Sequence, residues 1–124
     1  MSDTDDEQSM SPRAHELREL YEAFNARDID RVLAAMTADV EWPNGWEGGR
    51  LEGREAVRGY WVRQWAEVRL FLTPVEYREL GDGRMEVAVR QVARDPGGSV
   101  LAREAVRHVY EFDHGLVRRM HVER

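Results

Sequence analysis

Apolar positions follow helical spacing in the first half of the chain and alternate with polar positions in the second half. Four apolar or aromatic residues near the N-terminus recur three or four positions apart and predict the buried stripe of a helix: Leu17, Leu20, Tyr21 and Phe24. Ser11 suits a helix cap, and Pro12 suits the first helical position. We therefore expect a first helix from Pro12 to Ala26.

Two further helices and a short hairpin are expected before residue 68. Asp28 can cap a short second helix that runs from Ile29 to about Thr37. A third helix is expected over residues 54–66. Between them, residues 39–53 read as a short strand, a turn rich in Trp and Gly, and a second short strand.

After Val68 the alternation predicts four long strands, at residues 69–80, 84–94, 99–112 and 116–123. The three turns between them all contain glycine, which supplies the positive φ that tight hairpins need. This order predicts an antiparallel meander.

The turns also predict a register for the meander. We expect three hairpin-closing pairs: Leu80 with Arg84, Asp95 with Gly98, and Phe112 with Leu116. One face of the sheet then carries three inward rows: Tyr77-Val87-Val106-Val122, Glu79-Met85-His108-Met120, and Val75-Val89-Glu104-Arg124. Three helices covering this face of a twisted sheet give an α+β cone with a cavity at its wide end.

Length and charge indicate one domain with an acidic extension. The chain has 124 residues, 42% of them hydrophobic, and a net charge of −6. Residues 1–10 contain four acids and no base, so we expect a disordered acidic tail at 1–10 and a single domain at 11–124. The tail lacks the pattern of a signal peptide, and the longest apolar run, 32–36, cannot span a bilayer. A cytoplasmic protein without membrane contacts is expected.

Several classes of chemistry are excluded by composition. The absence of Cys excludes disulfides and thiolate catalysis, and the absence of Lys excludes a Schiff base. Arginines are scattered among acids, so nucleic-acid binding is not expected. His15, His114 and His121 form no metal-spaced group with His108, and no Ser-His-Asp arrangement is apparent, so neither a metal nor another cofactor is expected.

Aromatic side chains concentrate around the short hairpin and the third helix, at Trp42, Trp46, Tyr60, Trp61 and Trp65. Such a cluster is typical of the wall of a small-molecule pocket. Helical spacing alone also allows Trp61 and Trp65 to be core residues, and Trp46, in its Gly-rich turn, suits a mobile lid.

His108 is the sharpest candidate for chemistry. The register places it inward between Met85 and Met120, where an apolar site favours the neutral ring that can accept a proton. A histidine that simply bonds to backbone or water is the alternative. Tyr110, two residues along the strand, and Glu104 are the assisting candidates. The alternative for Tyr110 is a core role, and the alternative for Glu104 is an ion pair with Arg124.

The expected ligand contacts surround these residues. They are Trp42, Trp46, Tyr60, Trp61, Met85, Gln91 and Met120. Together they predict a pocket for a small, largely apolar molecule that carries one or two oxygens.

Three stretches resemble the SnoaL-like branch of the NTF2-like superfamily. They are LYEAFNARDIDRVLAAMTADVEW (20–42), GREAVRGYW (53–61) and HVYEFDHGLVRRMHVE (108–123). The resemblance implies an NTF2-like cone with three N-terminal helices on a strongly curved, mostly antiparallel sheet. It also implies a homodimer, as in much of the superfamily. All 18 basic residues are Arg and Ile occurs once, a bias that indicates a GC-rich bacterial genome.

The resemblance does not carry over the ketosteroid isomerase residues of this superfamily. The Asp base of those enzymes falls on Trp42, their helical Tyr on Leu20, and their protonated Asp on His108. An enzyme here would thus be a cofactor-independent isomerase, cyclase or lyase that hydrates or dehydrates, and not a standard ketosteroid isomerase. A non-catalytic binding module and a protein-interaction module with a filled cone are the alternatives.

Overall fold

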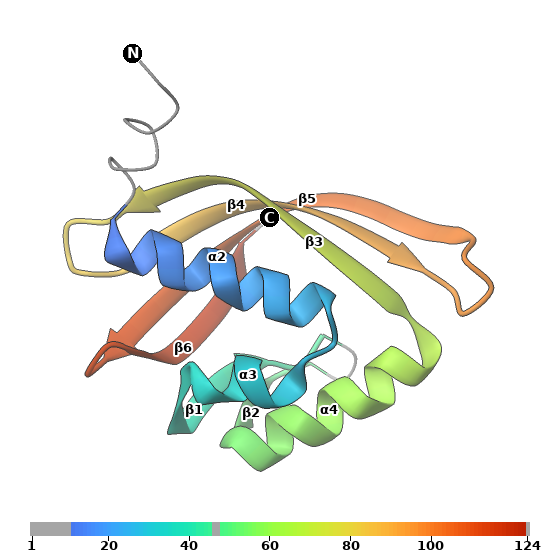
Figure 1. The fold of residues 1–124 in the computed structure, drawn as a ribbon, viewed down its shortest axis with the longest axis horizontal. Helices are drawn as coiled ribbons and strands as arrows, with labels where there is room; N and C mark the ends of the chain where they lie inside the picture. The colour runs from blue at the N-terminus through green and yellow to red at the C-terminus, as the bar shows by residue number, and fades with distance from the viewer. Residues whose placement is uncertain (1–10, 46–47, 124) are drawn as a thin grey trace.

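Three helices lie on one face of a curved six-stranded sheet (Figure 1). The structure is a computed structural model that describes residues 11–45 and 48–123. Along the chain the elements are α2 (Pro12–Asn25), α3 (Ile29–Ala34), β1 (Met36–Pro43), β2 (Arg50–Glu52), α4 (Arg54–Glu67), β3 (Arg69–Glu79), β4 (Met85–Arg94), β5 (Val100–Asp113) and β6 (Leu116–Glu123). The expected tail at 1–10 lies outside the described residues.

The helices begin where their caps predict. Ser11 Oγ accepts a hydrogen bond from the Ala14 amide at 3.1 Å, and Asp28 accepts one from the Arg31 amide at 3.3 Å. The second helix ends earlier than expected, at Ala34 instead of Thr37, because Met36 already starts β1. In that strand Met36 lies opposite Val117 of β6, so tertiary pairing replaces the last helical turn.

The strand order is β2-β1-β6-β5-β4-β3. All neighbours are antiparallel except β1 and β6, which run parallel. The expected α+β cone with a mostly antiparallel sheet is therefore confirmed. The long sheet bends over α2 and leaves α3, α4 and the short β1–β2 hairpin below it (Figure 1).

The expected register is right at the first hairpin and wrong at the next two. The Leu80 amide bonds to the Arg84 carbonyl, as expected. The second loop is one residue longer than expected, with the Asp95 amide bonded to the Ser99 carbonyl. In the third hairpin Asp113 pairs with Leu116, which leaves a two-residue turn.

A bulge follows each of these two turns, so β5 slides by two residues against both neighbours. A two-residue slide keeps the same side chains inward, because the strand period is two. His108 therefore stays inward but lies between Val87 and Val122. Tyr110 takes the expected place of His108, between Met85 and Met120.

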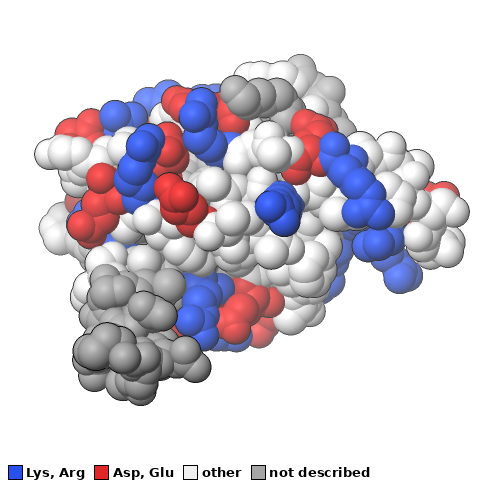
Figure 2. Space-filling view, turned by 90° about the horizontal axis from the view of Figure 1, so that it is seen from above, with Lys and Arg blue, Asp and Glu red and all other residues white. Residues whose placement is uncertain are grey.

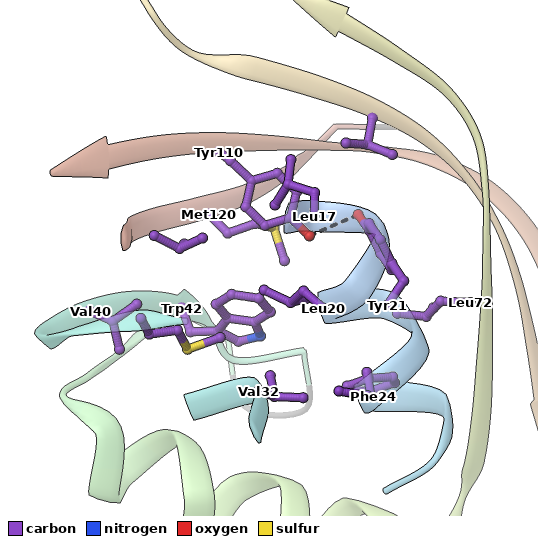
Figure 3. Close-up of a cluster of buried hydrophobic side chains, with 14 of the residues drawn as sticks. Leu17, Leu20, Tyr21, Phe24, Val32, Val40, Trp42, Leu72, Tyr110 and Met120 are labelled. Carbon is purple, nitrogen blue, oxygen red and sulfur yellow. Dashed lines mark hydrogen bonds between the residues drawn. The ribbon is translucent and has the colours of Figure 1, made fainter. Parts of the chain in front are cut away.

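The helix-facing side of the sheet carries the core (Figure 3). Leu17, Leu20 and Phe24 of α2 pack there against Trp42 and Leu72, all buried. The other side faces outward. Seen from that side, acidic and basic groups are interspersed with uncharged surface (Figure 2).

Candidate ligand-binding site

A cavity of about 230 Å³ lies between α2, α4 and the inner face of the sheet. Its wall is mostly aromatic and aliphatic. The lining residues are Leu20, Tyr21, Phe24, Trp42, Pro43, Gly45, Tyr60, Trp61, Gln64, Leu70, Leu72, Gln91, His108, Tyr110, Met120 and Val122. None of these carries a carboxylate or a guanidinium group, so the cavity is apolar with a few uncharged polar groups.

The aromatic wall is held by ring contacts. Trp42 of β1 and Trp61 of α4 meet edge to face with centroids 5.4 Å apart, and Phe24 of α2 meets Trp61 at 5.5 Å. Trp65 stacks behind Trp61 at 5.8 Å and does not line the cavity. Three different elements therefore fix the wall, and Trp65 supports it from outside.

A chain of three polar side chains crosses the buried end of the cavity. The Tyr110 hydroxyl donates to the Tyr21 hydroxyl oxygen at 2.8 Å (Figure 3). Tyr21 Oη in turn lies 2.8 Å from His108 Nδ1. The Tyr21 ring also stacks on the imidazole, with centroids 5.9 Å apart and planes 17° from parallel. The position and orientation of the His108 ring are therefore fixed by both packing and hydrogen bonding.

The direction of this chain determines which His108 nitrogen faces a ligand. With Tyr110 as the donor to Tyr21, the single hydroxyl hydrogen of Tyr21 can be directed to His108 Nδ1, and the neutral tautomer with its proton on Nε2 satisfies all three groups. Within residues 11–45 and 48–123, Nε2 has no hydrogen-bond partner, and His108 lines the cavity. Among the described residues, His108 Nε2 is therefore a polar atom of the cavity lining that can hydrogen-bond to a ligand oxygen.

Burial sets the protonation states of the three groups. Removal of His108 from water lowers the pKa of its imidazole from 6.5 to about 4, so the ring is neutral at pH 7. Burial raises the pKa of the Tyr21 and Tyr110 hydroxyls, so both stay protonated. At neutral pH these three groups are therefore uncharged, and they offer a ligand hydrogen bonds only.

A second polar group lies at the mouth of the cavity. The Tyr60 hydroxyl accepts hydrogen bonds from the Gly45 amide at 3.1 Å and from Gln64 Nε2 at 3.0 Å. These bonds tie α4 to the turn that follows β1. A side chain added at Gly45 would meet Tyr60 Oη at 3.1 Å, so the close approach favours glycine there.

Most of the expected site residues meet at this cavity. His108 and Tyr110, together with the expected contacts Trp42, Tyr60, Trp61, Gln91 and Met120, all line it. Trp46 lies outside the described residues.

Two expected site residues lie elsewhere. Met85 is buried opposite Tyr110 but does not reach the cavity. Glu104 is exposed, because the slide of β5 pairs it with Gln91 and carries it toward the open end of the sheet. Because the Glu104 side chain is exposed and does not line the cavity, we do not retain it as an acid or base.

Tyr21 is the site residue that the sequence did not reveal. Its place in the apolar stripe of α2 made it read as core, and the superfamily comparison placed the helical hydroxyl one residue earlier, at Leu20. The available signal was the hydroxyl itself, since a buried Tyr needs a hydrogen-bond partner and His108 is the buried polar group of the facing sheet.

Across residues 11–45 and 48–123, no group of three or more His, Asp or Glu side chains could hold a metal ion. No helix in the same part of the chain is long and apolar enough to cross a membrane.

The SnoaL-like domain family matches residues 17–120, so this chain belongs to that family. Solved structures with the same fold include an NTF2-like protein of unknown function from Burkholderia pseudomallei, which is 29% identical over 92% of this chain and 91% of that chain, with a TM-score of 0.79. TerC, co-crystallised with polyporic acid, is 27% identical over 90% of both chains, with a TM-score of 0.78.

A Mycobacterium tuberculosis protein in complex with estradiol-17beta-hemisuccinate shares the fold at 22% identity, over 90% of this chain and 92% of that chain, with a TM-score of 0.78. Among curated proteins no significant match is found.

Proposed function

We propose that the cavity binds a small, mostly apolar molecule through one of its oxygens, with His108 Nε2 as the polar anchor. The observation that carries this proposal is the buried Tyr110–Tyr21–His108 chain, which directs an N–H donor without a partner among the described residues toward an uncharged aromatic cavity. A volume of about 230 Å³ suits a molecule of one to three rings. The complex of the related TerC with polyporic acid supports a ligand-binding role.

The experiment is a titration of tryptophan fluorescence with cyclic ketones, enones, lactones and polyketide-like aromatics. Trp42 and Trp61 line the cavity, so a bound ligand changes their emission. A saturable response should weaken about tenfold in His108→Leu, which removes one hydrogen bond. His121→Ala is the matched control, because His121 lies on β6 beside Glu123 and does not line the cavity. If no member of the panel changes the tryptophan fluorescence, the result would favour a protein-interaction module instead.

Catalysis is the second candidate function, and its form is limited because none of the described lining residues carries a carboxylate. A neutral His108 polarises a carbonyl but is a weak base, since burial lowers its pKa to about 4. The substrate of an isomerisation, ring closure, hydration or dehydration here would therefore supply its own acidic proton. Product analysis of panel members that bind tests this. Turnover that persists in His108→Leu would contradict the assignment.

We further propose that the protein is a homodimer, as the family resemblance implies. Four large apolar side chains are exposed on strands of the sheet: Phe71, Val75, Val100 and Leu101. Their exposure supports an association between copies through the sheet. Sedimentation should show a dimer that Phe71→Glu converts to monomer, and a monomeric wild-type protein would contradict the proposal.

A further inference from the structure

The polar chain at the cavity is built only from groups whose hydrogen-bond direction can reverse. A backbone amide facing His108 Nδ1 would lock that nitrogen as an acceptor, and a carbonyl would lock it as a donor. The group that faces it is the Tyr21 hydroxyl, which both donates and accepts. The next group, Tyr110, is a hydroxyl as well.

This chain satisfies His108 in both of its charge states. With the neutral ring, Tyr110 donates to Tyr21, which donates to Nδ1. With the protonated ring, Nδ1–H donates to Tyr21, which donates to Tyr110, and the Tyr110 hydrogen turns into the cavity that this residue lines. The reversal needs only hydroxyl rotations, and the two 2.8 Å separations are kept.

None of the described residues that line the cavity carries a carboxylate or a guanidinium group that would compete with His108 for a ligand. Among the described residues, the titratable groups around it are tyrosines: Tyr21 of α2 and Tyr110 of β5 contact the His108 ring, Tyr60 of α4 lines the same cavity, and Tyr77 of β3 acts on Tyr21 and Tyr110. Burial raises the pKa of all four, so they remain uncharged. The residues opposite His108 on β4 and β6 are valines, and Arg18 and Glu22 act on Tyr77 with opposite effects.

We propose that the ligand is an oxygen acid, namely an enol or phenol that is ionised at neutral pH. Its binding takes up one proton, so that the ligand anion and protonated His108 form a pair with no net charge. This inference rests on the proposed ligand-binding function. An anion in this cavity has no counter-ion among the lining residues other than a protonated His108, because an unpaired buried charge is costly. A neutral ketone would need only a fixed donor, and a reversible chain would bring it no benefit.

Proton uptake follows from the chemistry of the pair. The free protein holds a neutral His108, since burial lowers its pKa to about 4, and the anion arrives without a proton. The bound pair contains one more proton than the separated partners, and the buffer supplies it. Between pH 6 and pH 8, affinity should therefore fall about tenfold for each pH unit, or about a hundredfold in all.

Isothermal titration calorimetry tests this with a matched pair of probes. 2-Hydroxy-1,4-naphthoquinone is ionised at pH 7, and its methyl ether has the same ring system without the acidic proton. The sequence contains no Cys or Lys side chain that would form adducts with a quinone. In buffers of different ionisation enthalpy, the hydroxy compound should bind with uptake of close to one proton. The ether should bind more weakly, without uptake and without the pH slope.

The variant Tyr21→Phe distinguishes the effect of the hydrogen-bond chain from the effect of ring packing on His108. It removes the acceptor for a protonated Nδ1 but keeps the ring that stacks on His108. The hydroxy compound should lose about tenfold in affinity while the ether is unchanged, and His121→Ala should change neither. Binding of the hydroxy compound without proton uptake, or equal losses for both probes, would overturn the inference and leave the binding function intact.

Binding of neither probe up to millimolar concentration would also overturn the inference. The fluorescence titration with neutral ketones and lactones then decides separately whether the proposed binding function survives. The calorimetry on the wild-type protein depends on no variant, so a failure of Tyr21→Phe to fold does not remove the test.

Discussion

Removing the Tyr21 hydroxyl should destabilise the protein far more than the loss of one surface hydroxyl would. Tyr21→Phe keeps the buried ring but leaves His108 Nδ1 without its donor and the Tyr110 hydroxyl without its acceptor. A buried polar group without a partner costs about 1–3 kcal/mol, so two such groups predict a loss of about 3 kcal/mol. No cavity contribution is expected, because the ring stays in place.

Urea unfolding followed by far-UV circular dichroism measures this loss as a change in the midpoint at constant slope. Tyr77→Phe is the matched control, because the Tyr77 hydroxyl is buried and has no hydrogen-bond partner among the described residues. Its removal should leave the free energy of unfolding unchanged or slightly higher. A loss below about 0.5 kcal/mol in Tyr21→Phe, or an equal loss in both variants, would refute the assigned role of the chain.

Three other predictions concern stability. Burial lowers the pKa of His108 from 6.5 to about 4, so the unfolded state binds more protons between these two pH values. The stability that this group contributes is present above pH 6.5 and falls by about 3 kcal/mol toward pH 4. His108→Gln should flatten this part of the pH profile of unfolding. Asn25→Ala removes two hydrogen bonds to the Leu72 backbone, at 2.8 and 2.9 Å, and should cost about 1–3 kcal/mol in urea unfolding; an unchanged midpoint would show that water replaces them. Gly115 has a φ of 81°, so Gly115→Ala should lower the melting temperature by a few degrees through about 1 kcal/mol of strain, whereas His114→Gly, at a φ of 52°, should not lower it.

The sequence predicts the elements of this fold better than it predicts their alignment. Period and caps locate α2, α4 and the four long strands to within a few residues, because these signals are local. The slide of β5 depends on the longer loop at 96–98, on the His114–Gly115 turn and on two bulges, and no Gly or Pro in the bulged segments indicates these bulges. Since the slide is an even number of residues, the division into inner and outer faces survives it.

The candidate site could be predicted in part for the same reason. His108 and Tyr110 are inward in either register, so their place at the cavity follows from strand period alone. Glu104 has the same inward parity, but its burial depends on which part of the sheet the helices cover. Tyr21 is on a different element, and its hydroxyl gains a partner only when α2 packs over β5. That contact is tertiary, and no local pattern encodes it.

The Asn25 amide also affects how this protein meets other chains. β3 is an edge strand, and the Leu72 amide and carbonyl point away from β4, as open edges do. Such free backbone groups are templates on which a foreign strand can add, and long edges promote aggregation. The carboxamide occupies both groups in the way a neighbouring peptide would. A single polar side chain at the end of α2 thus blocks sheet extension at the part of the edge that borders the cavity.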